Sequence, residues 1–250
     1  MTFVRLDIQE GLVTVRLERG KVNALNEQVV DELASCLRRL ESDPAVRGII
    51  LTGTGKFFSF GFDIPEFLGR SKEEFAGYLR KFTTLYRDLF LHPRPVVAAL
   101  NGHTVAGGCM LATACDVRVM VKENAKIGLN EIGFGSSVFA GSLELLRFWV
   151  GDRRAQEIVY GGTLYTAEQA LDRGLVDAVV PDGALLDEAR TRLEELASRS
   201  PQAFRSIKRL LRRPIVEEIE QREEASIREF VEIWYSEETR AELEKIKIRG

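Results

Sequence analysis

Alternating apolar and polar residues predict paired strands at the start of the chain. The segments "FVRLDI" (3–8) and "LVTVRL" (12–17) alternate and are separated by "QEG", a pattern typical of an antiparallel strand pair. Further short apolar runs predict buried strands. They are "VRGIILTG" (46–53), "RPVVAALNG" (94–102), "DVRVMV" (116–121), "AKIGL" (125–129) and "GLVDAVVP" (174–181).

Helices are predicted between these strands from their capping residues. Asn26 has the position of an N-cap, and the helix after it runs to about Asp43–Pro44. The spacings Ser71–Glu74 and Thr166–Gln169 are those of capping boxes. The first of these boxes opens a long helix that ends near His92–Pro93. Strands therefore alternate with helices, which predicts an α/β fold.

After residue 181 the pattern is helical to the end of the chain. One apolar face repeats at helical spacing and indicates a buried surface. Its residues are Ile215, Ile219, Ile227, Phe230, Val231 and Trp234. The sequence therefore predicts an α/β core over residues 1–190 and a helical C-terminal region over residues 191–250.

Composition and charge restrict the class of protein. The 250 residues are 45% hydrophobic and 29% charged, with a net charge of −3, which is ordinary for a soluble globular protein and argues against a nucleic-acid or anionic-membrane partner. No apolar run is long enough to span a membrane, and "MTFVRLDIQE" lacks the form of a signal peptide. We therefore expect a cytoplasmic protein. Its three cysteines and two histidines lack metal-ligand spacing, so we expect reduced, buried thiols and no metal.

A glycine pair marks the first candidate site. Gly107 and Gly108 lie in "VAGGCMLA" (105–112), directly after a buried strand and near a predicted helix start at Ala106. The first N–H groups of a helix have no internal partner and favour negative charge. Glycine lets a ligand approach them closely, so the pair could bind an oxyanion. The alternative is a tight turn with close packing of helix on strand.

A second loop has the same setting. "FFSFGFD" (57–63) follows a buried strand and precedes a helix, and Phe60–Gly61 could present another backbone N–H. Two donors directed at one oxygen would stabilise the enolate of a thioester. The alternative for the phenylalanines is packing in the core.

Five segments together resemble the crotonase (enoyl-CoA hydratase/isomerase) superfamily. They are "KVNALN", "FSFGFDI", "NGHTVAGGCMLATACDVRV", "IGLNEIGFG" and "AQEIVYGGTLYTAEQALDRGLVDAVVP". The resemblance implies a crotonase-like spiral of ββα units with a helical C-terminal trimerisation region. It also implies an acyl-CoA thioester substrate, no cofactor apart from the CoA of that substrate, and a homotrimer or a hexamer of paired trimers.

The resemblance also implies roles for individual residues. The thioester oxygen would lie between the N–H groups of Phe60 and Gly107. The residues that would line the pantetheine and the thioester are Gly61, Phe62, Asp63 and Ile64, and Ala24 would lie near the adenine end. Lys21, Lys56 and the segment "KRLLRR" (208–213) are candidates for the CoA phosphates, with solvated surface charge as the alternative.

One position departs from the hydratases of that family. They use two glutamates around one water, and the resemblance places Met110 at the first of these positions and Glu131 at the second. One carboxylate suffices to move a double bond from C3 to C2, by taking a proton from C2 and returning it at C4. "IGLNE", with Asn130 at the substrate, is similar to the Δ3,Δ2-enoyl-CoA isomerase branch. Without the resemblance, Glu131 would be read as a surface carboxylate.

Other functions remain open from the sequence. A different enolate reaction, such as decarboxylation or weak hydration, would need the same two donors. A catalytically silent acyl-CoA-binding homologue is the non-enzyme alternative. Phe60 stands where the family usually has a small residue, so its ring is expected to narrow the acyl pocket. Phe230 and Trp234 are candidates for a subunit interface, and His103 is expected to be a packed loop residue.

Overall fold

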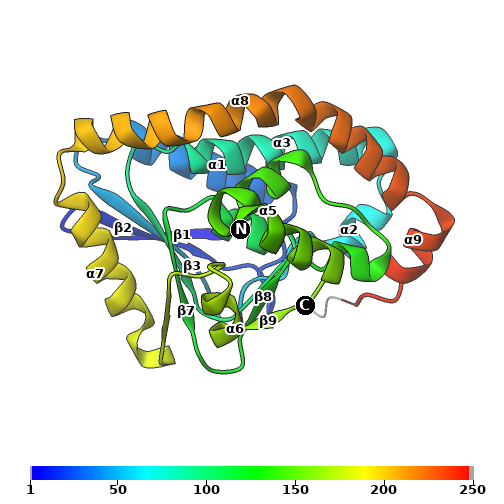
Figure 1. The fold of residues 1–250 in the computed structure, drawn as a ribbon, viewed down its shortest axis with the longest axis horizontal. Helices are drawn as coiled ribbons and strands as arrows, with labels where there is room; N and C mark the ends of the chain where they lie inside the picture. The colour runs from blue at the N-terminus through cyan, green and yellow to red at the C-terminus, as the bar shows by residue number, and fades with distance from the viewer. Residues whose placement is uncertain (1, 248–250) are drawn as a thin grey trace.

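The fold was analysed in a computed structural model, which describes residues 2–247 (Figure 1). Its larger sheet has the strand order β1-β2-β3-β5-β7-β10. The bounds are β1 Val4–Gln9, β2 Leu12–Leu17, β3 Gly48–Gly53, β5 Val96–Leu100, β7 Val117–Val121 and β10 Ala178–Val180. β1 and β2 are antiparallel, with Val4 opposite Leu17, and β2, β3, β5, β7 and β10 are parallel. This confirms the predicted N-terminal strand pair.

A smaller sheet lies beside the carboxyl ends of these parallel strands. Its order is β4-β6-β8-β9, with bounds β4 Phe57–Ser59, β6 His103–Val105, β8 Lys126–Gly128 and β9 Tyr165–Thr166. The chain passes from β3 to β4, from β5 to β6 and from β7 to β8, and a helix follows each of these strand pairs. These successive strand–strand–helix units confirm the predicted α/β architecture of ββα repeats.

Helices surround the two sheets. Their bounds are α1 Glu27–Ser42, α2 Ile64–Leu68, α3 Lys72–Phe90, α4 Gly107–Thr113, α5 Ala140–Gly161, α6 Ala167–Asp172, α7 Leu185–Ala197, α8 Pro201–Trp234 and α9 Glu237–Leu243; the 3-10 turns η1 and η2 span Glu131–Phe134 and Asp182–Ala184. α3 packs against α1 and α8, whereas α7 packs on β3, β5 and β7 (Figure 1). None of the helices in residues 2–247 is long and apolar enough to cross a membrane.

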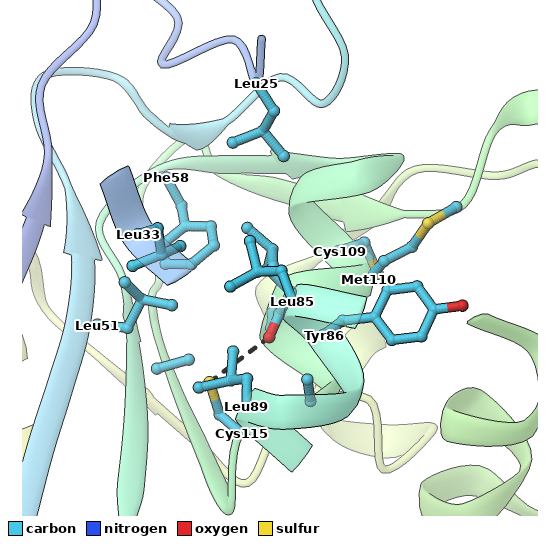
Figure 2. Packing of buried hydrophobic residues seen from close by; sticks show 14 of the residues in the cluster. Leu25, Leu33, Leu51, Phe58, Leu85, Tyr86, Leu89, Cys109, Met110 and Cys115 are labelled. Carbon is cyan, nitrogen blue, oxygen red and sulfur yellow. Dashed lines mark hydrogen bonds between the residues drawn. The ribbon is translucent and has the colours of Figure 1, made fainter. Parts of the chain in front are cut away.

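The predicted caps are present. Asn26 accepts a hydrogen bond from Val29 N, and both capping boxes form with their reciprocal bonds. The core lies between the larger sheet and its helices. Figure 2 shows Leu33 of α1, Leu51 of β3, Leu85 of α3 and Cys109 of α4 meeting there. The three cysteines are free and buried, as predicted.

The long helix α8 buries its apolar face within its own chain. Phe230 and Trp234 are 1% and 2% exposed, so they pack inside the chain, and the suggestion that they line an interface was wrong. Lys208 and Arg212 are also buried, with Lys208 Nζ 2.8 Å from Asp116 Oδ2 and Arg212 Nη2 2.9 Å from Asp116 Oδ1. These two cations are therefore neither solvated surface charges nor free to bind a phosphate.

Candidate active site

A cavity of about 50 Å³ lies where the two candidate loops meet. Its walls come from residues 60, 62 and 64 before and at the start of α2, residues 105–107 and 110 around the start of α4, residues 130, 131 and 134 around η1, and residues 230, 234 and 246 of the C-terminal region. The helix α9 lies against α2 and η1 on this side of the molecule (Figure 1). Most of the lining side chains are aromatic or aliphatic, so the cavity is a poor environment for charge.

A strained residue precedes α4. Ala106 has φ 50° and ψ −120°, a region that residues other than glycine rarely adopt and that costs about 1–3 kcal/mol. Its own N–H donates to Gly128 O at 3.0 Å. Gly107 follows, lines the cavity, and has an N–H without a hydrogen-bond acceptor in the described residues. The strain therefore holds a free backbone donor at the cavity wall.

Gly107 and Gly108 are each required for a different structural reason. A Cβ on Gly107 would lie 3.0 Å from a carbon of the Phe62 ring, at the cavity. A Cβ on Gly108 would lie 2.5 Å from Ser59 O, so Gly108 is needed for close packing of α4 on β4. Of the two alternatives for the glycine pair, oxyanion binding thus fits Gly107, and close packing of helix on strand fits Gly108.

In the second loop, residues 57–63, the free backbone N–H belongs to Phe62 and not to Phe60 as expected. Phe60 N donates to Val22 O at 2.9 Å, so this group is already used, and its assignment to the oxyanion was wrong. Leu25 N donates to Gly61 O at 2.7 Å, and Asp63 N donates to Leu25 O at 3.2 Å. Since N–H groups alternate along an extended chain, the intervening Phe62 N–H points away from Leu25. It makes no hydrogen bond within residues 2–247.

Gly61 brings this loop against the start of α4. It has φ +99°, and a Cβ on it would lie 3.0 Å from both Gly107 N and Ala106 Cβ. No side chain fits between the two segments. The free N–H groups of Phe62 and Gly107 therefore come from backbone segments in direct contact.

Glu131 is the first residue of η1 and is 4% exposed. Its Oε2 has no hydrogen-bond partner in the described residues, and neither has Asn130 Oδ1 beside it. Burial raises the pKa of Glu131 to about 8. Among the described lining residues Glu131 alone is ionisable. Met110 lines the same cavity, and its side chain leaves α4 on the side away from Leu33 and Leu51 (Figure 2).

Two of the predicted lining residues, Gly61 and Asp63, lie behind the cavity wall rather than in it, and so does Ala24, which is predicted near the adenine end. Asp63 accepts from Glu66 N as the N-cap of α2, and its Oδ2 lies 2.6 Å from Arg19 Nη2. Ala24 is buried, and its carbonyl accepts from Arg19 Nη1 at 3.1 Å. With Gly61 they support the loop, whereas Phe62 and Ile64 do line the cavity. His103 lies in β6, with its ring centroid 5.0 Å from that of Phe57.

Part of the cavity wall was not predicted from the sequence. Phe134, Phe230, Trp234 and Ile246 line the cavity from η1 and the C-terminal region. Phe230 and Trp234 are four residues apart, so the sequence predicts that they lie on one face of a helix. It does not predict which surface that face contacts. Within residues 2–247 no group of three or more His, Cys, Asp or Glu side chains is placed to hold a metal ion.

Known proteins share both the sequence pattern and this fold. A family model described as "Enoyl-CoA hydratase/isomerase" matches residues 7–247. A protein of Bacillus subtilis (strain 168) named "Probable enoyl-CoA hydratase" is 35% identical over 84% of this chain and 82% of its own length. "Enoyl-CoA delta isomerase 1, mitochondrial" of Mus musculus is 32% identical over 88% of this chain and 77% of its own. The crystal structure of human mitochondrial delta3-delta2-enoyl-CoA isomerase superposes with a TM-score of 0.93 at 28% identity, covering 97% of this chain and 96% of that one.

Proposed function

The chain belongs to the enoyl-CoA hydratase/isomerase family, with the crotonase-like fold that its sequence predicts, and we propose that it moves a double bond from C3 to C2 of an enoyl-CoA. The choice of isomerisation over hydration rests on one observation: among the described lining residues, a single side chain is ionisable. Glu131 can exchange protons, whereas Met110 on the same cavity wall cannot. Addition of water needs a second group to orient and activate that water, and no lining residue in the described chain supplies one.

The proposed reaction begins with the carboxylate of Glu131. It takes a proton from C2 of a 3-enoyl-CoA, and the electrons of that C–H bond form a dienolate whose charge moves onto the thioester oxygen. The N–H groups of Phe62 and Gly107 stabilise this oxygen, and donors of this kind are each worth about 10²–10³ in rate. The carboxylic acid of Glu131 then protonates C4, and the double bond is left between C2 and C3.

The surroundings of Glu131 suit a proton shuttle. A general acid–base works best when its pKa lies near the working pH, because both protonation states are then accessible. Burial raises the pKa of Glu131 to about 8, which meets this condition. The apolar walls also disfavour a bound water that would compete with the proton transfer. Asn130, next to Glu131, offers a free amide oxygen at the substrate.

We also propose that the protein assembles as a homotrimer or a pair of trimers. The outer face of α8 carries Ile207, Leu210 and Leu211, which are 58%, 72% and 61% exposed. Apolar side chains gathered on one exposed face are typical of a surface that is covered by a partner. Light scattering after gel filtration tests this: a mass of about 28 kDa would contradict it.

The test of the reaction is an assay with two substrates on the purified protein. One arm supplies 3-hexenoyl-CoA and follows the formation of the conjugated 2-enoyl product. The other supplies crotonyl-CoA and follows the loss of conjugation as water adds. We expect isomerisation to exceed hydration by a large factor, and we expect Glu131→Gln to abolish it, because the amide cannot take the C2 proton.

The other outcomes distinguish the alternatives. Dominant hydration would mean that another group replaces the missing carboxylate, and the isomerase proposal would be wrong. Turnover of neither substrate, with tight binding of acyl-CoA, would favour a decarboxylase or a silent binding protein. Glu229→Gln, on the exposed side of α8, is the control for the loss of one carboxylate and should leave both arms unchanged.

A further inference from the structure

The two tryptophans of the chain differ in how their indole N–H groups are used. Trp149 Nε1 donates to Thr113 O at 2.7 Å. Trp234 Nε1 is buried in a side chain that is 2% exposed, and it has no acceptor in residues 2–247. A buried donor without an acceptor costs about 1–3 kcal/mol, and native proteins pair nearly all such groups.

The position of Trp234 indicates where an acceptor can come from. Its side chain lines the same cavity as Glu131. Its ring centroid lies 4.8 Å from that of Phe75 and 5.7 Å from that of Phe230. These contacts fix the ring, so the N–H cannot turn towards bulk water. Because residues 2–247 offer no acceptor at this position, a molecule that enters the cavity can supply one.

We propose that Trp234 determines substrate specificity by donating its indole N–H to a neutral oxygen, a carbonyl or a hydroxyl, on the acyl chain of the CoA thioester. This inference rests on the proposed function of the cavity as the acyl-CoA site. The oxygen is neutral because no described lining residue carries a positive charge. An acyl carboxylate would therefore lack a counter-charge and would be repelled by the anionic form of Glu131.

A binding experiment tests the hydrogen bond without turnover. Since the chain has two tryptophans, its ¹H–¹⁵N spectrum has two indole resonances, assigned with Trp234→Phe and Trp149→Phe. The ligands are 7-oxooctanoyl-CoA and octanoyl-CoA, which are saturated and cannot isomerise. We expect the Trp234 resonance to move downfield with the oxo ligand and not with octanoyl-CoA. The Trp149 resonance is the internal control and should move with neither. A Trp234 shift that is the same with both ligands would overturn the proposal.

A kinetic experiment tests the consequence for specificity. The quantity is the ratio of kcat/KM for 7-oxo-3-octenoyl-CoA to that for 3-octenoyl-CoA. Trp234→Phe keeps an aromatic ring and removes the N–H, so we expect this ratio to fall about 3- to 10-fold, as for the loss of one hydrogen bond. Trp149→Phe should leave the ratio unchanged. A ratio that Trp234→Phe does not alter would overturn the proposal.

The two experiments separate this inference from the proposed reaction. If the Trp234 resonance responds to the oxo ligand and neither 3-enoyl substrate is isomerised, the specificity role stands and the isomerase assignment fails. If both substrates are isomerised and Trp234 responds to neither test, the isomerase assignment stands and the specificity role fails. Absence of any acyl-CoA binding would refute both.

Discussion

Phe60 N donates to Val22 O at 2.9 Å, so Phe60 is not among the free backbone N–H groups of the loop. Gly61 N donates to Ser59 Oγ at 3.1 Å, so this group is engaged too. With Phe60 and Asp63 engaged by Val22 and Leu25, Phe62 has the free donor. The proposed oxyanion hole therefore consists of the N–H groups of Phe62 and Gly107, and the Phe60 side chain lines the cavity.

Phe60→Ala is expected to change substrate preference rather than the chemistry. The Phe60 ring lines the cavity, so its removal makes room for longer or branched acyl chains, while the backbone bond to Val22 is kept. We expect kcat/KM for the longer chains to rise relative to that for 3-hexenoyl-CoA, measured over a series of chain lengths. Phe57→Ala, at a ring outside the described cavity wall, is the control. An unchanged order of substrates would contradict this role.

Gly61→Ala is expected to abolish activity. The new Cβ would lie 3.0 Å from Gly107 N and would adopt φ +99°, so the two donor segments would have to separate. We expect kcat to fall at least 100-fold, as for the loss of one oxyanion donor. Gly55→Ala is the matched control, because Gly55 also has positive φ (+68°) but no atom within 4 Å of its Cβ position. Equal effects of the two variants would mean that backbone strain, not separation of the donors, causes the loss.

The strands of the larger sheet were predictable from the sequence, whereas most of those of the smaller sheet were not. β4 and β6 have three residues each, too few for any periodicity to be visible. They are strands because they pair with each other, with His103 N donating to Lys56 O at 2.9 Å. Pairing between residues 47 positions apart cannot be predicted from the pattern of neighbouring residues. For the same reason the sequence identified the loop around Phe60 without showing which N–H was free.

The charged segment 208–213 shows a second limit. It reads as a solvated run of cations, yet Lys208 and Arg212 are one helical turn apart and both meet Asp116 inside the protein. The spacing of four residues was visible in the sequence. The buried acid that decides the environment of these two cations is contributed by a distant strand end, and only the fold brings it there.

Activity is expected to rise with pH through the range around 8. Glu131 must be ionised to take the C2 proton, and burial raises its pKa to about 8. Below that value, kcat/KM should fall about tenfold per pH unit, because it reports the free enzyme. The measurement is kcat/KM for 3-hexenoyl-CoA from about pH 6 to 9, with circular dichroism at each pH to verify folding. A flat profile over this range would show that Glu131 ionises with an ordinary pKa or is not the base.

Glu131→Gln is expected to stabilise the folded protein at neutral pH. The pKa of Glu131 is raised on folding from 4.5 to about 8, so the folded state binds a proton that the unfolded state has released. Wild-type stability is therefore lost progressively as pH rises from about 4.5 to 8. The amide of Glu131→Gln does not ionise and shows no such loss. We therefore expect the free energy of unfolding of the variant to exceed that of the wild type by up to about 3 kcal/mol at pH 7 and by almost nothing near pH 4.

The measurement is the free energy of unfolding by urea at both pH values. Glu229→Gln, at an exposed glutamate, controls for the change in net charge and should show no difference between the two. A Glu131→Gln variant that is less stable than the wild type at pH 7 would mean that the carboxylate is stabilised by a partner in the folded state.

Met110→Glu is expected to introduce hydration of crotonyl-CoA. Met110 is 1% exposed and lines the cavity with Glu131, so a carboxyl group there would supply the second proton-transfer group that addition of water needs. Two carboxyls in one apolar cavity cannot both ionise easily, and one pKa should be raised further. We expect measurable hydration in the variant and a lower free energy of unfolding, since a buried methionine is replaced by an acid. Met110→Gln has a similar size and no acid–base group, so it should isomerise but not hydrate. Equal hydration by both variants would show that Met110 excludes water because it is apolar, and its lack of a carboxyl group would then not explain the choice of reaction.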